Sequence, residues 1–367
     1  MGRPAEIVPL LERHINSKDE PDLFSMAALG EAYLYAGDIE QAIDIYTKAV
    51  NLWPKRVFLQ ARLAVSYLRA GDKDNAISKL RPLADVAKAG KAHILLINTY
   101  IEKGDKPAAL KFAKNLVKSN VDSEDSHFIQ GYTFTRIGAL DEAVAAYKRA
   151  IDINAAYIPA ILGLAEIFVL EKRFVQAKKT YQRVLAIEGE HFSSLLKLAE
   201  IEHHQNNISV ASNWYAKAAE IEPNSIEAIR GLIKIDILEG RALLALNKSR
   251  EFTDKQPENI EGLALMAISL IANEEEASAG AYLRRYLEKK PEDTSFRALL
   301  SDLLINSGDL EGALKEISAA LKIMPEHKSL RVRKINVLVR MKRFDEARAE
   351  IGELKALNTD WNFNRMI

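Results

Sequence analysis

Four prolines in the second half of this 367-residue chain recur at a constant interval, which restricts the folds that the chain can adopt. Each lies 34 residues from the next, five residues after an Ala, Phe or Tyr: Pro223, Pro257, Pro291 and Pro325. The segment Ala218–Pro223 also corresponds to Ala49–Pro54 near the other end of the chain. Self-similarity with a period of about 20–50 residues is typical of repeat architectures. We therefore expect one structural unit to be reused throughout the chain.

The unit that begins at Leu23 shows what is repeated. Its residues are Leu29, Gly30 and Tyr33 in a first helix, Gly37–Asp38 in a turn, and Ala42, Tyr46 and Ala49 in a second helix. This pattern resembles the tetratricopeptide (TPR) repeat, in which small residues let two antiparallel helices approach closely. Pro54 then ends the second helix.

The same frame recurs along almost the whole chain. Ten units are predicted, starting near residues 23, 57, 90, 124, 158, 192, 226, 260, 294 and 328. The match is degenerate in places, since Asp236, Leu270 and Leu304 replace aromatic residues of the pattern. The predicted fold class is all-α, and the resemblance implies a right-handed superhelical solenoid of about ten hairpins. The first helices would line its concave groove.

The domain organisation expected from this pattern is one array over residues 23–360 with no internal boundary. Residues 1–22 are predicted to form a partial or capping helix, because Ile7, Leu10, Leu11 and Ile15 have helical spacing. The apolar residues of segment 361–367 suggest the start of a further helix or a cap. Because solenoids normally close with a polar cap, we expect the array to continue in a longer parent protein.

The composition excludes several classes of function. The 51 basic and 51 acidic residues cancel, so no long-range field attracts nucleic acid or an anionic membrane. The chain has no Cys, which excludes disulfides, thiolate nucleophiles and lipidated cysteines. No signal peptide or membrane-spanning run is present, so the sequence as written predicts a cytoplasmic protein without direct membrane insertion.

Motifs for catalysis are also absent from the sequence. No phosphate-binding loop, dinucleotide fingerprint, nucleophile elbow or zinc-protease motif occurs, so we expect no enzyme activity and no cofactor. Glu200 and His203 have the spacing of a ligand pair in carboxylate-bridged di-metal sites, but no second copy is present. We therefore predict no metal site.

The resemblance places positions 2, 5, 9 and 12 of each unit in the groove. In the first four units, these positions give an apolar strip: Phe24, Leu34, Phe58, Val65, Leu68, Ile94, Ile101, Phe128 and Tyr132. Two interpretations remain open. The strip binds an amphipathic or extended segment of a partner protein, or its side chains pack on neighbouring units.

The groove becomes polar in later units. Position 9 is Glu166, Glu200 and then Lys234, with Glu227 and Arg230 nearby. These charges either pair between adjacent units, as Glu200 with Lys234, or match a partner segment. A clamp for a chaperone's terminal carboxylate is excluded, because Ile94 and Ile129 stand where that clamp needs Lys and Asn.

These residues favour a non-catalytic protein-binding scaffold. Segments such as Leu63–Asp72 and Asn213–Ala218 resemble the repeats of TPR-repeat lipoproteins in bacterial exopolysaccharide and PEP-CTERM protein-sorting systems. That resemblance implies a bacterial envelope assembly, and a periplasmic or outer-membrane location if the chain is excised from a lipoprotein. The alternative is the regulatory arm of a larger enzyme such as a glycosyltransferase.

Overall fold

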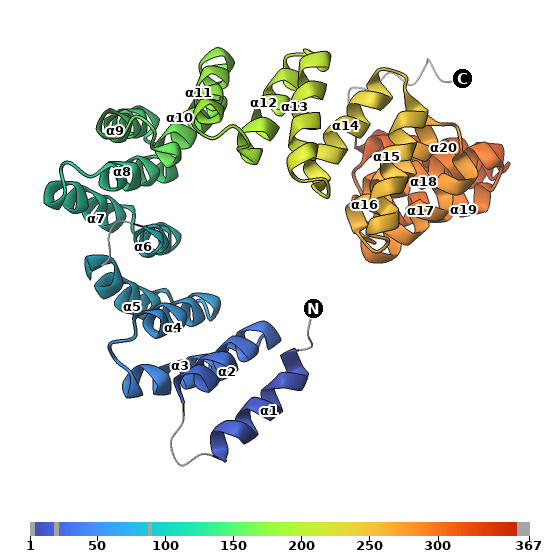
Figure 1. The fold of residues 1–367 in the computed structure, drawn as a ribbon. Helices are drawn as coiled ribbons and strands as arrows, with labels where there is room; N and C mark the ends of the chain where they lie inside the picture. The colour runs from blue at the N-terminus through green and yellow to red at the C-terminus, as the bar shows by residue number, and fades with distance from the viewer. Residues whose placement is uncertain (1–3, 18–21, 87–89, 358–367) are drawn as a thin grey trace. The chain divides into compact units, whose positions relative to one another are not determined.

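The computed structural model describes residues 4–17, 22–86 and 90–357, and every regular element in these ranges is an α-helix. The chain divides into two compact units, residues 1–189 and 190–367, which are described separately (Figure 1). The all-α class and the repeated hairpins expected from the sequence are confirmed. The expectation of a single array remains a prediction.

The first unit contains one leading helix and five hairpins. Its helices are α1 (Pro4–Asn16), α2 (Leu23–Ala36), α3 (Ile39–Leu52), α4 (Val57–Arg69), α5 (Lys73–Val86), α6 (Lys91–Glu102), α7 (Lys106–Ser119), α8 (Glu124–Ile137), α9 (Leu140–Ile153), α10 (Ile158–Leu170) and α11 (Phe174–Ile187). Helix α1 packs on α2, where the Tyr33 hydroxyl donates a hydrogen bond to the Glu12 carboxylate. That α1 acts as a cap is still a prediction.

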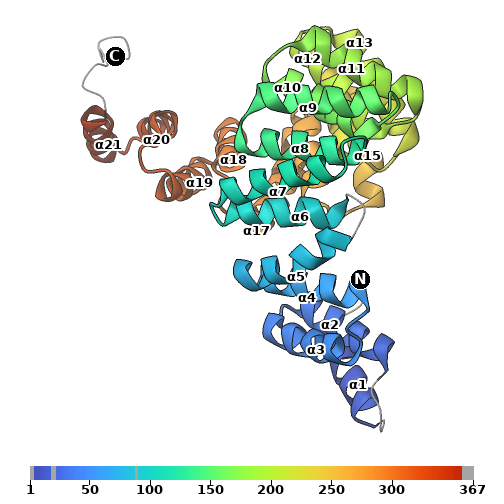
Figure 2. The same cartoon turned by 90° about the vertical axis from the view of Figure 1, so that its left-hand side faces the viewer.

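The second unit contains five more hairpins. Its helices are α12 (Phe192–His204), α13 (Ile208–Ile221), α14 (Ile226–Leu238), α15 (Ala242–Lys255), α16 (Ile260–Ala272), α17 (Glu276–Lys289), α18 (Thr294–Ser307), α19 (Leu310–Ile323), α20 (Lys328–Arg340) and α21 (Phe344–Ala356). Figure 2 views α19, α20 and α21 nearly along their axes, packed side by side. The segment 361–367 lies outside the described residues.

Glycine and tyrosine residues set the distance between the two helices of a hairpin. A Cβ atom added to Gly131 on α8 would lie 2.6 Å from the Tyr147 ring on α9. A Cβ atom added to Gly163, on the first helix of the next hairpin, would lie 2.5 Å from the same ring. Tyr147 is therefore enclosed by its own hairpin and by the one that follows, and larger residues at either glycine would separate the helices.

The turns between hairpins are held by side chains at the fourth position of the following helix. Gln60 donates a hydrogen bond to the Pro54 carbonyl oxygen at 2.7 Å. The corresponding bonds of Arg297 to Pro291 and Arg331 to Pro325 each measure 2.9 Å. These bonds satisfy carbonyl groups that the proline turn leaves outside the helices.

The turn inside every hairpin contains one residue in the left-handed conformation, fourteen residues after the unit's start. Six of these residues are glycines, with φ between 73° and 89°: Gly37, Gly71, Gly104, Gly138, Gly240 and Gly308. The other four hairpins use Lys172, Asn206, Glu274 and Lys342, with φ between 58° and 63°. The left-handed conformation costs a residue with a Cβ atom about 1 kcal/mol.

Replacing Lys172 by glycine should therefore stabilise the protein by about 0.5–1 kcal/mol, because glycine adopts this conformation without steric cost. Urea unfolding of the full chain, followed by far-UV circular dichroism, measures the change. The matched control is Lys179→Gly, an exposed position inside α11, which should destabilise the protein by about 1 kcal/mol. A lower unfolding midpoint for Lys172→Gly would contradict this account of the turn.

Candidate functional site

The candidate site is the face formed by positions 2, 5, 9 and 12 of the first helices, which we call the first-helix face. In the first unit α6, α8 and α10 contact one another in sequence, and in the second unit α12, α14 and α16 do so. The Tyr132 hydroxyl donates a hydrogen bond to Asn98 Oδ1 at 2.8 Å, which joins position 9 of one hairpin to position 9 of the next. Equivalent positions of consecutive hairpins thus lie side by side on this face.

Two phenylalanines of the predicted strip are exposed. Phe24 on α2 is 80% exposed and Phe58 on α4 is 45% exposed, and both occupy position 2 of their units. Val65 and Ile94 are half-buried. Leu34 is only 5% exposed and packs in the core around Tyr46, so its side chain is not presented to a partner.

The remaining apolar residues of the strip pack on their neighbours. Leu68, Ile101, Phe128 and Tyr132 contact the buried cluster formed by α4 to α8. The Phe128 ring also lies 6.0 Å from that of Tyr147 and 5.9 Å, edge to face, from that of Tyr157. These four side chains therefore pack on neighbouring units, which is the second of the two interpretations, although each stays partly exposed.

The charged residues of the strip have several kinds of partner. Glu166 is exposed on α10. Glu200 pairs with Lys197 on its own helix at 2.7 Å, and the expected pair between Glu200 and Lys234 is not formed. Lys197 lies three residues from Glu200 on the same helix, so it can neutralise the carboxylate without a contact between hairpins.

Arg230 forms an ion pair that crosses between hairpins. Its guanidinium lies 2.9 Å from the Glu261 carboxylate at position 2 of the next unit. Glu227 accepts a hydrogen bond from the Ser225 hydroxyl at 3.0 Å. Lys234, in contrast, is joined to no acidic side chain among the described residues of the chain.

A pocket of about 570 Å³ opens beside Arg230 and Lys234. Apolar residues from α14 and α16 line it, among them Ile237, Ala264 and Ile268, and Lys290 lies at its edge. Lys290 and Ile268 were not predicted from the sequence. Ile268 occupies position 9 of its unit, so the expectation that positions 2, 5, 9 and 12 lie in the groove could have identified it. Lys290 follows the second helix α17, and an expectation about first helices does not include it.

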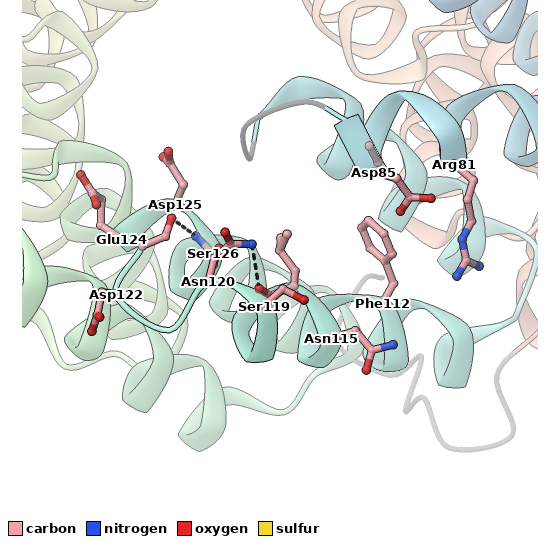
Figure 3. A pocket seen from close by; sticks show the side chains of 13 residues that line it. Arg81, Asp85, Phe112, Asn115, Ser119, Asn120, Asp122, Glu124, Asp125 and Ser126 are labelled. Atoms are coloured by element: carbon pink, nitrogen blue, oxygen red, sulfur yellow. Dashed lines mark hydrogen bonds between the residues drawn. The ribbon is translucent and has the colours of Figure 1, made fainter.

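A second pocket, of about 710 Å³, lies at the ends of α5 and α7 and the start of α8 (Figure 3). It is rich in acidic residues, including Asp85, Asp122, Glu124 and Asp125. Two of these carboxylates are already engaged, because Asn154 donates a hydrogen bond to Glu124 at 3.2 Å and the Tyr157 hydroxyl donates one to Asp125. Apart from Asp125, which is at position 2 of its unit, the residues that line this pocket lie outside the first-helix face.

Neither pocket resembles a metal centre. Within residues 4–17, 22–86 and 90–357, no three His, Asp or Glu side chains are placed to hold a metal ion together. In the same ranges, no helix combines the length and the apolar character needed to cross a membrane.

Helix α6 carries a buried histidine. His93 on α6 has no exposed surface, and its Nδ1 atom accepts a hydrogen bond from the Gly90 N–H at 3.3 Å. Its Nε2 atom has no hydrogen-bond partner among the described residues. Burial lowers the pKa of His93 below its usual value, although the negative charges of Asp85 and Asp125 act in the opposite direction.

Comparisons with known proteins point to one family. Models described as tetratricopeptide repeat match residues 27–89, 94–158, 138–195 and 304–362, which together make up more than half of the chain. A TPR repeat-containing protein of Methanocaldococcus jannaschii is 25% identical over 157 residues. The match covers 40% of this chain and 27% of that protein, so the chain spans little more than a quarter of its relative's length.

Solved structures with similar folds are distant in sequence. A tetratricopeptide repeat protein from Parabacteroides merdae is 16% identical, with a TM-score of 0.49 over 67% of this chain and 97% of that one. Yeast Tom70 is 15% identical, with a TM-score of 0.47 over 97% of this chain and 88% of that one. These scores are below 0.5, so the description of the fold depends on the helix pairs and the family match.

The buried His93 makes the stability of the protein depend on pH. Because the pKa of His93 is lowered in the folded state, the unfolded chain takes up a proton on this side chain at a higher pH than the folded chain does, as the pH falls through about 6.5. Stability should therefore fall between pH 7.5 and pH 5.5. In His93→Leu, this loss should be smaller than in the wild type, as measured by urea unfolding at both pH values. An equal loss in the two proteins would contradict the assignment of a neutral His93.

Proposed function

We propose, from the premise that this chain belongs to the tetratricopeptide repeat family, that it is a non-catalytic scaffold which binds segments of partner proteins on its first-helix face. One observation carries the proposal. Phe24 and Phe58 occupy the same position in consecutive hairpins, and both rings are exposed. Large aromatic side chains lose little entropy on binding and bury a large apolar area, so they commonly anchor protein interfaces.

The strip around these rings supports the same function. Val65 and Ile94 are half-buried, and Ile101, Phe128 and Tyr132 pack on the core while part of their surface stays exposed. An apolar segment of a partner would cover the exposed rings and extend along these residues. Packing of the strip and binding on it are therefore compatible, because the packed residues form a rigid floor and the two phenylalanines provide the contacts.

The non-catalytic part of the proposal depends on the sequence. The chain contains no motif for binding a nucleotide, activating a serine or holding a catalytic zinc ion, and it has no Cys. Its net charge of zero favours a protein partner over nucleic acid.

A finer proposal concerns the cellular setting. The resemblance of segments such as Leu63–Asp72 to bacterial TPR-repeat lipoproteins supports a role in an envelope exopolysaccharide or protein-sorting assembly. The alternative is a regulatory arm of a larger enzyme such as a glycosyltransferase. The full reading frame and its neighbouring genes discriminate between them, because an adjoining nucleotide-sugar-binding domain would favour the enzyme.

The experiment compares two variants of the full chain, expressed with an affinity tag in the native host. The double variant Phe24→Ser, Phe58→Ser should weaken binding of the captured partner about tenfold or more, because two apolar anchors are lost. The matched control is Phe344→Ser, which removes another exposed phenylalanine (52% exposed) at the start of the second helix α21. Circular dichroism verifies that both variants are folded.

Partner recovery that falls in the double variant and not in the control supports the proposal. Recovery that is unchanged in the double variant would place the binding surface elsewhere, and equal losses in the two variants would show that the effect is not specific to the first-helix face.

A further inference from the structure

The second unit has a pocket on its first-helix face whose walls are apolar and whose edge is cationic. We propose that this pocket binds an apolar segment of a partner protein that carries an acidic side chain. The inference rests on the proposed function and adds the chemistry of the segment. We call the pocket the α14–α16 site, defined by Arg230, Lys234, Ile237, Glu261, Ile268 and Lys290.

The floor of the α14–α16 site is apolar and comes from two consecutive hairpins. Ile233 and Leu265 are buried beneath it, and Ile237 and Ala264 are half-buried at its surface. Ile268 is 37% exposed, so part of this floor is open to solvent. The volume of about 570 Å³ lies within the usual range for binding clefts, and this floor would accommodate apolar side chains.

The wall on the α17 side is rigid. The rings of Tyr286 and Phe296 are stacked with their centroids 4.2 Å apart. The Tyr286 hydroxyl donates a hydrogen bond to Asp293 Oδ2 at 2.8 Å, which fixes the ring. A wall that is already ordered loses little entropy when a segment binds against it.

The charges of the residues that line the site do not cancel. Arg230 and Glu261 neutralise each other at 2.9 Å, which leaves Lys234 and Lys290. Neither lysine is paired with an acidic side chain in the part of the chain that the structure describes. The whole chain has a net charge of zero, so this excess is local and favours a carboxylate close to an apolar anchor.

The carboxylate has two sources, an Asp or Glu side chain or the terminus of the partner chain. We favour the side chain, because the lining comes from both α14 and α16, so that a segment crossing these two helices can place an acidic side chain beside an apolar one. The terminal carboxylate is therefore an outcome of the test, and peptides with amidated and free C-termini separate the two sources.

The test is a selection of random 12-residue peptides on the full chain, carried out once with amidated and once with free C-termini and followed by fluorescence anisotropy of the enriched peptides. A class of enriched peptides should contain apolar residues within one helical turn of an Asp or Glu. Their Kd should rise about tenfold in Lys234→Glu, Lys290→Glu, since two attractions become repulsions. The neutral variant Lys234→Gln, Lys290→Gln should give an intermediate Kd, and the Kd should also rise with salt concentration.

The matched control is Lys315→Glu, Lys322→Glu, which makes the same charge change at two exposed positions of the second helix α19. Its Kd values should stay within about twofold of the wild-type values, because these positions lie outside the pocket. Equal losses in the control and in the lysine variant of the site would overturn the inference by showing a non-specific charge effect.

Several further outcomes contradict the inference. Enriched peptides without acidic residues, or a Kd that does not change in the charge-reversal variant, would exclude the proposed chemistry. Binding only by peptides with a free C-terminus would assign the site to a terminal carboxylate. Peptides that are lost in Phe24→Ser, Phe58→Ser but bind normally to the lysine variants would leave the proposed function standing and overturn this inference alone. No enrichment at all would count against both.

Discussion

The structure depends on burial of the apolar side of each hairpin against the hairpin that follows it. Tyr147 shows the interaction most clearly, because its ring touches Gly131 of its own hairpin and Gly163 of the next at distances that leave no room for a Cβ atom. Burying a large apolar side chain contributes about 1.5–3 kcal/mol, which a hairpin alone does not obtain. Stability is then approximately a sum over hairpins and their contacts with neighbours.

This stacking brings residues that are about one repeat apart into contact, and it thereby constructs the candidate site. Tyr132 bonds to Asn98, and Arg230 pairs with Glu261, across consecutive hairpins. Since the buried positions maintain the stacking, the exposed positions of the first helices are free to differ. The first unit presents the exposed rings of Phe24 and Phe58, whereas the second presents cationic groups around an apolar pocket.

The sequence predicted the repeats well because the period itself is the signal. Most first helices begin where the frame places them, and the unit expected at Gly90 begins its helix at Lys91 with Gly90 as the N-cap residue. Phe24 and Phe58 are exposed, as expected for position 2 of a unit. Helix starts and exposed positions follow from local sequence, which is why they were accessible without a structure.

Other features depend on contacts between side chains that cannot be inferred from a residue's position in the repeat. Leu34 was expected on the groove, but it packs in the core, and its carbonyl oxygen accepts a hydrogen bond from Arg69 of the next hairpin at 2.8 Å. Phe128 lies among aromatic rings that include Tyr157, a residue of the turn between hairpins. Asp236, at a position where other units have an aromatic residue, is buried and paired with Arg241 and Lys248.

The most direct test of the stacking compares two deletions in the second unit. Removing residues 260–293 deletes one 34-residue period and joins the N-cap Asn259 to Thr294, whereas removing residues 260–276 deletes about half a period and places a second helix where a first helix belongs. Far-UV circular dichroism with urea unfolding should show unchanged ellipticity per residue and cooperative unfolding for the full-period deletion, and a clear loss of both for the half-period deletion. Equal behaviour of the two proteins would contradict the claim that each hairpin is stabilised by the next one.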